Sequence, residues 1–279
     1  MKRRDIGNYG ICSLSAIPVR MKADRSSMVL TQMLFGEYVE VLTVKNKHWI
    51  KVICLYDQVV GWVDPKQILF LPSDFDPLDS IDFAVSLEVV QPAYYKDYSI
   101  PIPIASSLPF FDGISFYLNK KKFSFSGQAI TKSTELIHPE LLTKVLRRFL
   151  TAPESRGGRT IFGIDSSAFV QLVFKIFHIE LPRLAQHQIE YGQSILFHHE
   201  MALGDIAFFE NKQGVINHVG IVYGHKQIIH VHGQTRIDKL DQHGIFNSDE
   251  RRYTHKLRII QRIDHFIDFD ILTEINDKK

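Results

Sequence analysis

The most constraining feature of the sequence is an apolar segment between residues 169 and 177 that has no continuous polar face. Its apolar positions are Phe169, Val170, Leu172, Val173, Phe174, Ile176 and Phe177. This spacing predicts a helix that begins at Ser166 and ends near Phe177. A helix that is apolar nearly all round must be covered on every side, so we expect it at the centre of a domain.

The residues before this helix predict how it begins. Asp165 directly precedes it, and a carboxylate in that position accepts hydrogen bonds from the unpaired amides of the first turn. Ser166 would lie in the first turn, where the helix dipole favours negative charge. A nucleophile is often placed there in enzymes, whereas the simpler interpretation is a helix N-terminal serine that satisfies backbone amides. Both interpretations stay open on this pattern.

After this helix and a second helical stretch around residues 182–191, the chain returns to strands, over residues 205–209, 215–223 and 227–231. His218 and His230 lie on neighbouring strands. If the hairpin loop has an odd number of residues, side-chain alternation places both histidines on one face and close together. A nucleophile, a base and an orienting residue would then form a triad, unless the pair is simply two half-buried sheet histidines. Helices with an antiparallel sheet predict an α+β domain.

The front of the chain predicts a different architecture. Residues 9–71 alternate polar and apolar positions with turns between them, which is typical of a small β-barrel. Residues 72–77 are rich in Pro and Asp and indicate a linker. Residues 87–130 predict a second small barrel, with turns at Asp112-Gly113 and Asn119-Lys120. Helical spacing appears from 136 to 150. We therefore predict domains at 1–72, 79–132 and 133–279.

Composition excludes several classes of protein. The chain has 33 basic and 31 acidic residues, a net charge of +2, which argues against nucleic acid or an anionic membrane as partner. Its two cysteines, Cys12 and Cys54, cannot form a disulfide framework and are expected to be buried thiols. No segment reaches the roughly 18 apolar residues of a membrane span, and the N-terminus lacks a signal peptide's apolar run. We expect a cytoplasmic protein, or an exported one if a leader has been removed.

The motifs of the second half, taken in order, resemble the catalytic domain of the NlpC-type cell-wall peptidases. They are Gly157-Gly158-Arg159-Thr160, the run from Gly163 to Phe169, Leu181-Pro182-Arg183, Gln188, the run from Gly204 to Phe209, His218-Val219-Gly220-Ile221 and Ile229-His230. The resemblance implies a papain-like α+β domain, with a central helix on an antiparallel sheet. The front of the chain is similar to the two small all-β SH3-like barrels that precede this domain in one subgroup.

That subgroup cleaves the amide between γ-linked D-glutamate and a diamino acid in short wall peptides with a free N-terminal L-alanine, and its first barrel helps to close the substrate cleft. By position, the resemblance implies that Ser166 stands at the nucleophile, that His218 is the general base and that His230 orients it. Asp165 and Ser167 match positions that line the substrate site. No cofactor is implied.

Two departures from the family pattern concern the chemistry. The family nucleophile is a cysteine, and a serine hydroxyl is a far weaker acid, so the dipole and a histidine would leave Ser166 protonated. Upstream, where the family usually has Tyr-x-Trp, this chain has Glu154-Ser155-Arg156, and the Glu154 carboxylate could oppose an oxyanion. Whether the chain is an enzyme therefore stays open.

Two hypotheses follow from these residues. The first is a hydrolase-fold protein that engages peptides of the L-Ala-γ-D-Glu-diamino acid type in a cleft beside Ser166. The second is a non-catalytic binding or regulatory module that uses the same cleft. Histidine pairs at 198–199 and at 230 and 232 raise the question of a metal, but the sequence has no HExxH motif, no cysteine pair and no acidic partner at ligand spacing. We predict no metal site, no nucleic-acid partner and no membrane span.

Overall fold

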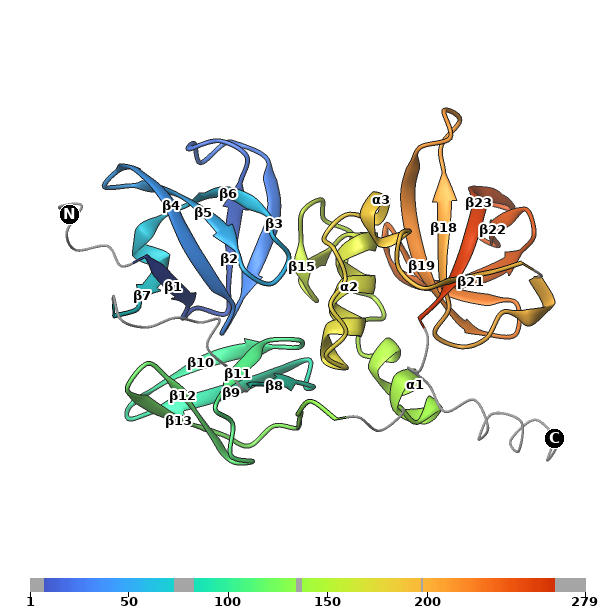
Figure 1. The fold of residues 1–279 in the computed structure, drawn as a ribbon. Helices are drawn as coiled ribbons and strands as arrows, with labels where there is room; N and C mark the ends of the chain where they lie inside the picture. The colour runs from blue at the N-terminus through green and yellow to red at the C-terminus, as the bar shows by residue number, and fades with distance from the viewer. Residues whose placement is uncertain (1–7, 73–82, 134–136, 197, 264–279) are drawn as a thin grey trace. The chain divides into compact units, whose positions relative to one another are not determined.

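The computed structural model describes residues 8–72, 83–133, 137–196 and 198–263 (Figure 1). The chain forms two compact units. Unit 1 contains the chain up to Lys132 together with Ser155–Gly163 and Phe174–Glu180, and unit 2 contains Ser133–Glu154, Ile164–Val173 and the chain from Leu181 onward. This grouping does not test the three predicted domains, which stay a prediction. Most of the predicted linker at 72–77 lies outside the described residues.

The first β module of unit 1 is a seven-stranded antiparallel sheet with the order β3-β2-β6-β5-β4-β1-β7. Alternating burial along β5 shows the expected strand periodicity, with one side chain in two facing the core. Cys12 and Cys54 are buried free thiols in this core, as predicted. The strands are β1 (Tyr9–Cys12), β2 (Ala16–Arg20), β3 (Val29–Leu34), β4 (Tyr38–Asn46), β5 (Trp49–Cys54), β6 (Val60–Val63) and β7 (Ile68–Phe70), with a 3-10 turn η2 (Pro65–Gln67) before β7.

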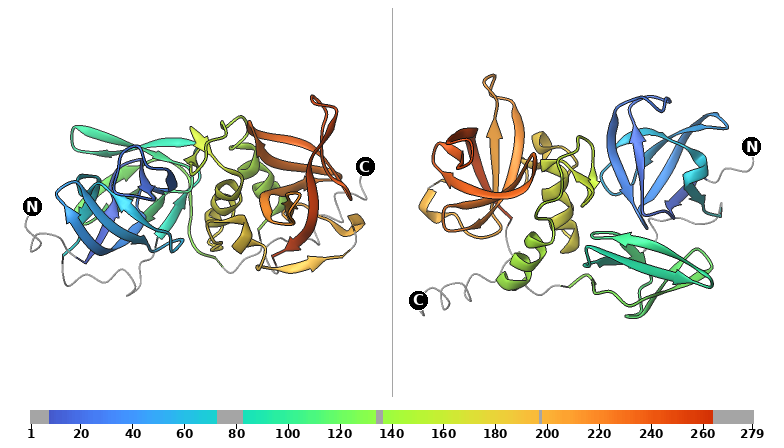
Figure 2. Two further views of the ribbon diagram at one scale, coloured as in Figure 1. Left: turned by 90° about the horizontal axis from the view of Figure 1, so that it is seen from above. Right: turned by 180° about the vertical axis from the view of Figure 1, so that it is seen from behind.

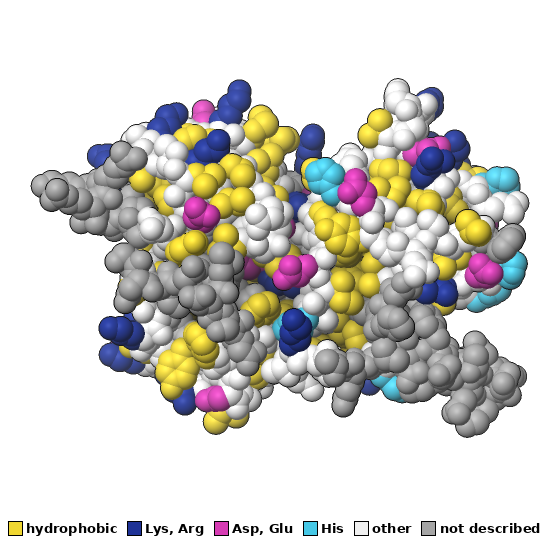
Figure 3. Space-filling model, in the orientation of Figure 1, with side chains coloured by type: hydrophobic (Ala, Val, Ile, Leu, Met, Phe, Trp, Pro, Cys, Tyr) yellow, Lys and Arg dark blue, Asp and Glu magenta, His cyan; other side chains and the backbone are white. Residues whose placement is uncertain are grey.

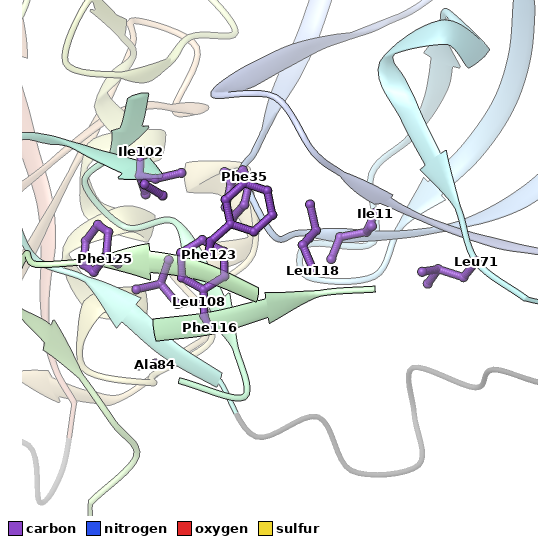
Figure 4. Close-up of a cluster of buried hydrophobic side chains, with 11 residues drawn as sticks. Ile11, Phe35, Leu71, Ala84, Ile102, Leu108, Phe116, Leu118, Phe123 and Phe125 are labelled. Atoms are coloured by element: carbon purple, nitrogen blue, oxygen red, sulfur yellow. The ribbon is translucent and has the colours of Figure 1, made fainter. Parts of the chain in front are cut away.

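The second β module of unit 1 has two small sheets, β10-β9-β13-β12 and β11-β8-β14. Its core is a cluster of phenylalanines in which the rings of Phe116 and Phe123 stack at 5.4 Å and Phe35 meets Phe116 edge-on (Figure 4). The predicted turn at Asn119-Lys120 joins β12 to β13. The strands are β8 (Phe83–Ser86), β9 (Val90–Tyr95), β10 (Tyr98–Pro103), β11 (Ser107–Pro109), β12 (Ser115–Leu118), β13 (Lys121–Phe125) and β14 (Ala129–Ile130).

A buried ion cluster holds distant segments of unit 1 together. Glu37 accepts hydrogen bonds from Arg159 Nη1 at 2.9 Å and Nη2 at 3.0 Å and from Lys175 Nζ at 2.5 Å. The three residues are 4%, 1% and 2% exposed. Burial opposes ionisation of Glu37, but Arg159 and Lys175 outweigh it and hold the pKa of Glu37 at about 2. Buried ionic hydrogen bonds therefore link a residue of the first β module, Glu37, to a helix residue, Lys175.

Among the described residues, unit 2 contains helices α1 and α3, helix α2 as far as Val173, and a sheet, whereas the last turn of α2 and the segment 155–163 before it belong to unit 1. Helix α1 covers Pro139–Arg147 and α2 covers Ser166–Ile176, close to the predicted helices, although residue 136 lies outside the described residues. The helical stretch expected around 182–191 is only the short α3 (Ala185–Gln188), because it follows Pro182 and its N-cap Leu184 supplies no capping hydrogen bond. A two-stranded ribbon, β15 (Arg159–Thr160) and β16 (Gly163–Ile164), precedes α2.

The sheet of unit 2 closes on itself. Its order is β17-β23-β18-β19-β20-β21-β22, and an additional β22–β23 pairing completes the ring, which curls round visibly in Figure 2. The elements are β17 (Gln193–Ile195), a 3-10 turn η3 (His198–Glu200), β18 (Ile206–Glu210), β19 (Ile216–Gly224), β20 (Gln227–His232), β21 (Gln234–Asp241), β22 (Gly244–Asn247) and β23 (Arg252–Arg262).

Positions that face the interior of this ring are apolar at one end and polar at the other. The apolar end includes Ala207, Phe209, Val222, Ile228, Leu240, Ile245 and Ile260. Two residues along from Ile228 comes His230, and two residues before Leu240 comes Asp238, so the alternation of side chains places these polar residues on the same interior face. The polar end of a β-barrel is a common location for a functional site.

Two further findings bear on partners. Within the described residues, no helix is both long enough and apolar enough to cross a membrane. On the face shown in Figure 3, Lys and Arg side chains are interspersed with Asp, Glu and apolar side chains, in line with the near-balanced net charge.

Candidate active site

Helix α2 begins at Ser166 and is capped by the residue before it. Asp165 Oδ1 accepts a hydrogen bond from Ala168 N at 2.9 Å, which confirms the predicted cap. Ser166 is half-buried in the first turn, while Phe169 and Val170 behind it are fully buried. The dipole of a mostly buried helix therefore ends at Ser166.

Asp165 and Ser167, the predicted substrate-binding residues, share one buried cation. Arg183 donates hydrogen bonds to Asp165 Oδ1 at 2.9 Å, to Asp165 Oδ2 at 2.6 Å and to Ser167 Oγ at 2.9 Å. Ser167 Oγ also donates to Asp165 Oδ1 at 3.0 Å. These contacts give both residues a structural role at the start of α2, and their contact with a substrate stays a prediction.

The segment before α2 is held against the β20–β21 turn. Ile164 N donates to Pro153 O at 3.0 Å, and Glu154 N donates to Gly233 O at 2.9 Å. Glu154 Oε2 in turn accepts a hydrogen bond from Gly233 N at 2.7 Å. The Glu154 carboxylate, expected to oppose an oxyanion, is thus engaged with a backbone amide of the turn that follows His232.

Helix α3 links the start of α2 to β19. Gln188 Nε2 donates to Ser167 O at 3.0 Å and to Pro182 O at 2.8 Å. From the same helix, Gln186 Nε2 donates to Ile216 O at 2.8 Å, two residues before His218. The start of α2 and the strand that carries His218 therefore belong to one hydrogen-bonded framework within unit 2.

The two predicted histidines are brought together and continue into a carboxylate. A hydrogen bond joins His218 Nε2 to His230 Nδ1 at 2.9 Å, and another joins His230 Nε2 to Asp238 Oδ2 at 3.0 Å. The three residues are buried, with exposures of 6%, 0% and 6%. We call this row the His218–His230–Asp238 chain. It confirms that the two histidines share a face, and it adds Asp238, which the sequence pattern did not reveal.

The register of the sheet explains how the histidines meet. His230 lies opposite Gly220 and not opposite His218, so the two rings approach diagonally. A Cβ at Gly220 would lie 2.9 Å from His230 Cβ and 2.9 Å from Ile229 O, closer than real Cβ atoms come. The missing side chain at Gly220 therefore provides the space in which the His230 ring leans toward His218.

Burial keeps the histidines of this chain uncharged. Desolvation, with His255, His230 and His232 nearby, lowers the pKa of His218 well below its usual range. Desolvation also lowers the pKa of His230, although Asp238 partly offsets it. Burial opposes ionisation of Asp238, but hydrogen bonds from His230 and Arg236 outweigh it and lower the pKa of Asp238. His218 and His230 are therefore neutral, and Asp238, which is hydrogen-bonded to His230, is ionised.

A third histidine, which the sequence pattern did not single out, covers the base. The His255 ring of β23 stacks on the His218 ring at 3.9 Å with an angle of 24° between their planes. Desolvation and the neighbouring His230 and His232 lower the pKa of His255 to about 3. No local pattern in the sequence could indicate this contact, because β23 and β19 become neighbours only where both pair with β18.

The histidines also raise the question of a metal. Among the described residues, one possible ligand atom from each of His218, His230 and His255 lies within 4.8 Å of the others. An ion must lie in the plane of every imidazole that binds it, but the His218 and His255 planes are stacked, and His218 Nε2 and His230 Nδ1 bond to each other. The arrangement favours proton transfer over metal binding.

An open groove lies beside His255, between the β18–β19 loop and β23. Most of the residues that line it have polar or charged side chains, among them Glu210, Asn211, Lys212, Asn217, Tyr253 and Lys256. Because His255 both lines the groove and stacks on His218, the groove adjoins the His218–His230–Asp238 chain.

Two family profiles match the chain. The profile of the NlpC/P60 family matches residues 154–256, and that of the bacterial dipeptidyl-peptidase Sh3 domain matches residues 19–68. A probable endopeptidase NlpC homolog of Haemophilus influenzae is 35% identical over 132 residues, which are 46% of this chain and 67% of the relative. The γ-D-glutamyl-L-lysine dipeptidyl-peptidase of Bacillus subtilis is 25% identical over 223 residues, which are 73% of this chain and 72% of the relative.

Solved structures are similar in fold. The crystal structure of an NlpC/P60 family protein from Bacillus cereus superposes with a TM-score of 0.75 at 20% identity, over 91% of this chain and 99% of that one. An NlpC/P60 endopeptidase from Photobacterium damselae superposes with a TM-score of 0.68 at 15% identity, over 93% and 72%.

Proposed function

Because the chain belongs to the NlpC/P60 family, a family of cell-wall peptidases, we propose that it recognises short wall peptides of the L-Ala-γ-D-Glu-diamino acid type at the start of α2. The Bacillus subtilis relative, named for a γ-D-glutamyl-L-lysine substrate, supports this peptide class. The groove beside His255 supplies polar wall residues for such a peptide.

The His218–His230–Asp238 chain carries this proposal. A row of buried, hydrogen-bonded titratable groups is costly to maintain and is typical of functional sites. Its carboxylate is ionised and its histidines are neutral, which is the resting state that a general base requires. Asp165 and Ser167 would contact the peptide next to Ser166.

The His218–His230–Asp238 chain also favours a second candidate function. This is hydrolysis of the γ-D-glutamyl amide, with Ser166 in the position of the nucleophile. Ser166 Oγ would attack the carbonyl carbon while its proton passes to His218. As the C–N bond breaks, that proton moves to the leaving amine of the diamino acid, and water then releases the ester with His218 again as base. A serine hydroxyl is a weak acid, so we expect turnover far slower than with a cysteine.

Calorimetric titration of L-Ala-γ-D-Glu-diamino acid peptide, followed by mass spectrometry of the recovered peptide, tests both functions. Binding with intact peptide supports the recognition module. Cleavage that Ser166→Ala abolishes supports the hydrolase, and Ser166→Cys should then raise the rate. The matched control is the peptide with an α-linked glutamate. Equal binding of both peptides, or of neither, would overturn the proposal.

The two β modules are part of the proposal as well. We assign residues 1–72 and 79–132 as SH3-like barrels that precede a papain-like domain at 133–279. The profile match at residues 19–68 supports the first barrel, and the two small sheets around one phenylalanine core support a second module.

A further inference from the structure

We propose that Asp238 is a positioning residue that sets the tautomers of His230 and His218, so that the proton acceptor of the site is His218 Nδ1. This assignment concerns hydrogen positions in the protein itself. Only its catalytic meaning rests on the proposed function.

The Asp238 carboxylate determines the position of the first proton. Asp238 Oδ2 lies 2.8 Å from Arg236 Nε, and Oδ1 accepts a hydrogen bond from Arg236 Nη2 at 2.9 Å. An arginine is always charged, and its fork holds a carboxylate in the ionised form. Asp238 can therefore only accept hydrogen bonds. Since His230 Nε2 is 3.0 Å from Asp238 Oδ2, the proton of that bond must reside on His230 Nε2.

The tautomer of His230 then determines that of His218. A neutral imidazole carries one N–H, so His230 with a proton on Nε2 has a bare Nδ1. That bare nitrogen lies 2.9 Å from His218 Nε2, which must then be the donor. His218 in turn has its proton on Nε2 and a bare Nδ1. The reverse assignment would put the bare His230 Nε2 against an ionised oxygen, two acceptors facing each other in a buried site.

Arg236 also anchors the carboxylate from the far side. Arg236 Nη2 donates to Asp249 Oδ2 at 2.7 Å, and the Asp249 side chain is 75% exposed while that of Asp238 is 3% exposed. Arg236 thus connects the buried chain to the surface and restricts rotation of the Asp238 carboxylate. Asp249 accepts a hydrogen bond from the same arginine but is not a member of the His218–His230–Asp238 chain, so it offers a matched control.

This role has a chemical consequence for the base. When His218 Nδ1 takes up a proton, the imidazolium is surrounded by His230, His232 and His255, all of which oppose its charge. The compensating negative charge in the chain is Asp238, reached through the His230 ring. Replacing that carboxylate by an amide would offer His230 Nε2 a donor, move the His230 proton to Nδ1 and put the His218 proton on the acceptor atom.

Long-range proton–nitrogen NMR of the imidazole rings tests the proposal without any turnover. In the unmodified protein at pH 7 we expect both His218 and His230 to carry hydrogen on Nε2 and none on Nδ1, with signals assigned from His218→Gln and His230→Gln. Asp238→Asn should move the proton of His230 to Nδ1, Asp238→Glu should retain the original pattern, and Asp249→Asn should leave it unchanged.

A protonated His218 Nδ1 in the unmodified protein would overturn the proposal, as would unchanged tautomers in a folded Asp238→Asn protein. If Asp238→Asn does not fold, the spectrum of the unmodified protein decides alone. Failure of peptide binding would count against the proposed function and would leave these spectra unaffected.

Discussion

At the level of single residues, the site depends on an absent side chain as much as on those present. Gly220 faces His230 across the β19–β20 pair, and a Cβ there would lie 2.9 Å from His230 Cβ, so its absence leaves room for His230 beside His218. The base and its neighbour are thus aligned by register and by one glycine. Gly224, at the end of the same strand, offers a contrast: a Cβ added there would meet no heavy atom of the described residues within 4 Å.

Gly220→Ala should therefore disrupt the histidine pair. The added methyl group must displace His230 Cβ or the Ile229 carbonyl, which should lower the free energy of unfolding by about 1–3 kcal/mol and weaken the hydrogen bond between the rings. Urea unfolding followed by circular dichroism, with ring NMR at pH 7, measures both effects. Gly224→Ala is the control and should change neither. A Gly220→Ala protein with unchanged stability and ring signals would contradict this account of the register.

At the level of elements, α2 is anchored differently at its two ends. Its first turn is held by the Asp165 cap and by Arg183, and its last turn contributes Lys175 to the buried cluster around Glu37. Between these ends the helix is apolar, so burial of its side chains stabilises it on all sides. Helix propensity alone would not fix where the helix starts, but the cap and the ion pair do.

Substitutions of Asp165 separate the cap from the ion pair. Asp165→Asn retains an oxygen for the Ala168 amide but leaves the buried Arg183 without its carboxylate, which should cost about 3–5 kcal/mol. Asp165→Ala also removes the cap and should cost about 1 kcal/mol more. Amide hydrogen exchange of the first turn of α2 and chemical unfolding measure the two steps. Lys122→Gln, which removes an exposed ion pair with Asp112 and leaves the hydrogen bonds of Asp112 to its turn in place, is the control and should leave the stability nearly unchanged. Equal losses for both Asp165 variants would show that the cap contributes nothing.

At the level of the complete chain, the two units bury titratable groups in different charge states. Unit 2 buries histidines that stay neutral, and unit 1 buries the ionised Glu37. A histidine with a depressed pKa stabilises the fold above its unfolded pKa, and that contribution is lost as the pH falls toward the folded pKa. A carboxylate with a depressed pKa behaves in the same way, but in a lower pH window.

Acid should therefore weaken the two units at different pH values. For His255, with a pKa lowered from 6.5 to about 3, stability should begin to fall below pH 6.5, by about 2 kcal/mol between pH 7 and pH 5. Glu37, with a pKa lowered from 4.5 to about 2, should affect unit 1 only below pH 4.5. Hydrogen exchange in strands β18–β23 follows unit 2, and fluorescence of Trp49 and Trp62, the two tryptophans of the chain, follows unit 1.

His255→Phe provides the matched variant for this experiment, because it retains a stacked ring that does not titrate. We expect it to remove the contribution of His255 to the loss of stability of unit 2 between pH 7 and pH 5. The pH dependence of the stability of unit 1 should stay unchanged. If both units lost stability together near pH 6, and this variant did not change that loss, the assignment of the two units to different pH ranges would be contradicted.

Much of the fold could be predicted because its signals are local. The apolar run of α2, its cap at Asp165 and the alternation of strands depend on residues a few positions apart, so their pattern appears directly in the sequence. That His218 and His230 share a face was predicted on the condition of an odd hairpin loop. The strands are joined by two residues between Gly224 and Gln227, and the register shift between Val222 and Gly224 supplies the extra residue that restores the parity. The extent of α3 was overestimated, because the spacing of apolar residues did not account for Pro182 and the uncapped Leu184.

The order of residues was enough to specify a central helix, a strand-rich front half, a near-balanced charge and a histidine pair on one face. Three contacts became visible only in the folded chain: His255 stacks on His218, Asp238 ends the hydrogen-bonded row, and Arg183 neutralises Asp165. These contacts, like those of Glu37 with Arg159 and Lys175, depend on how strands and helices pack. Their physical reason is the packing of strands and helices that are separate in the sequence and the burial of charge, neither of which leaves a periodic pattern along the chain.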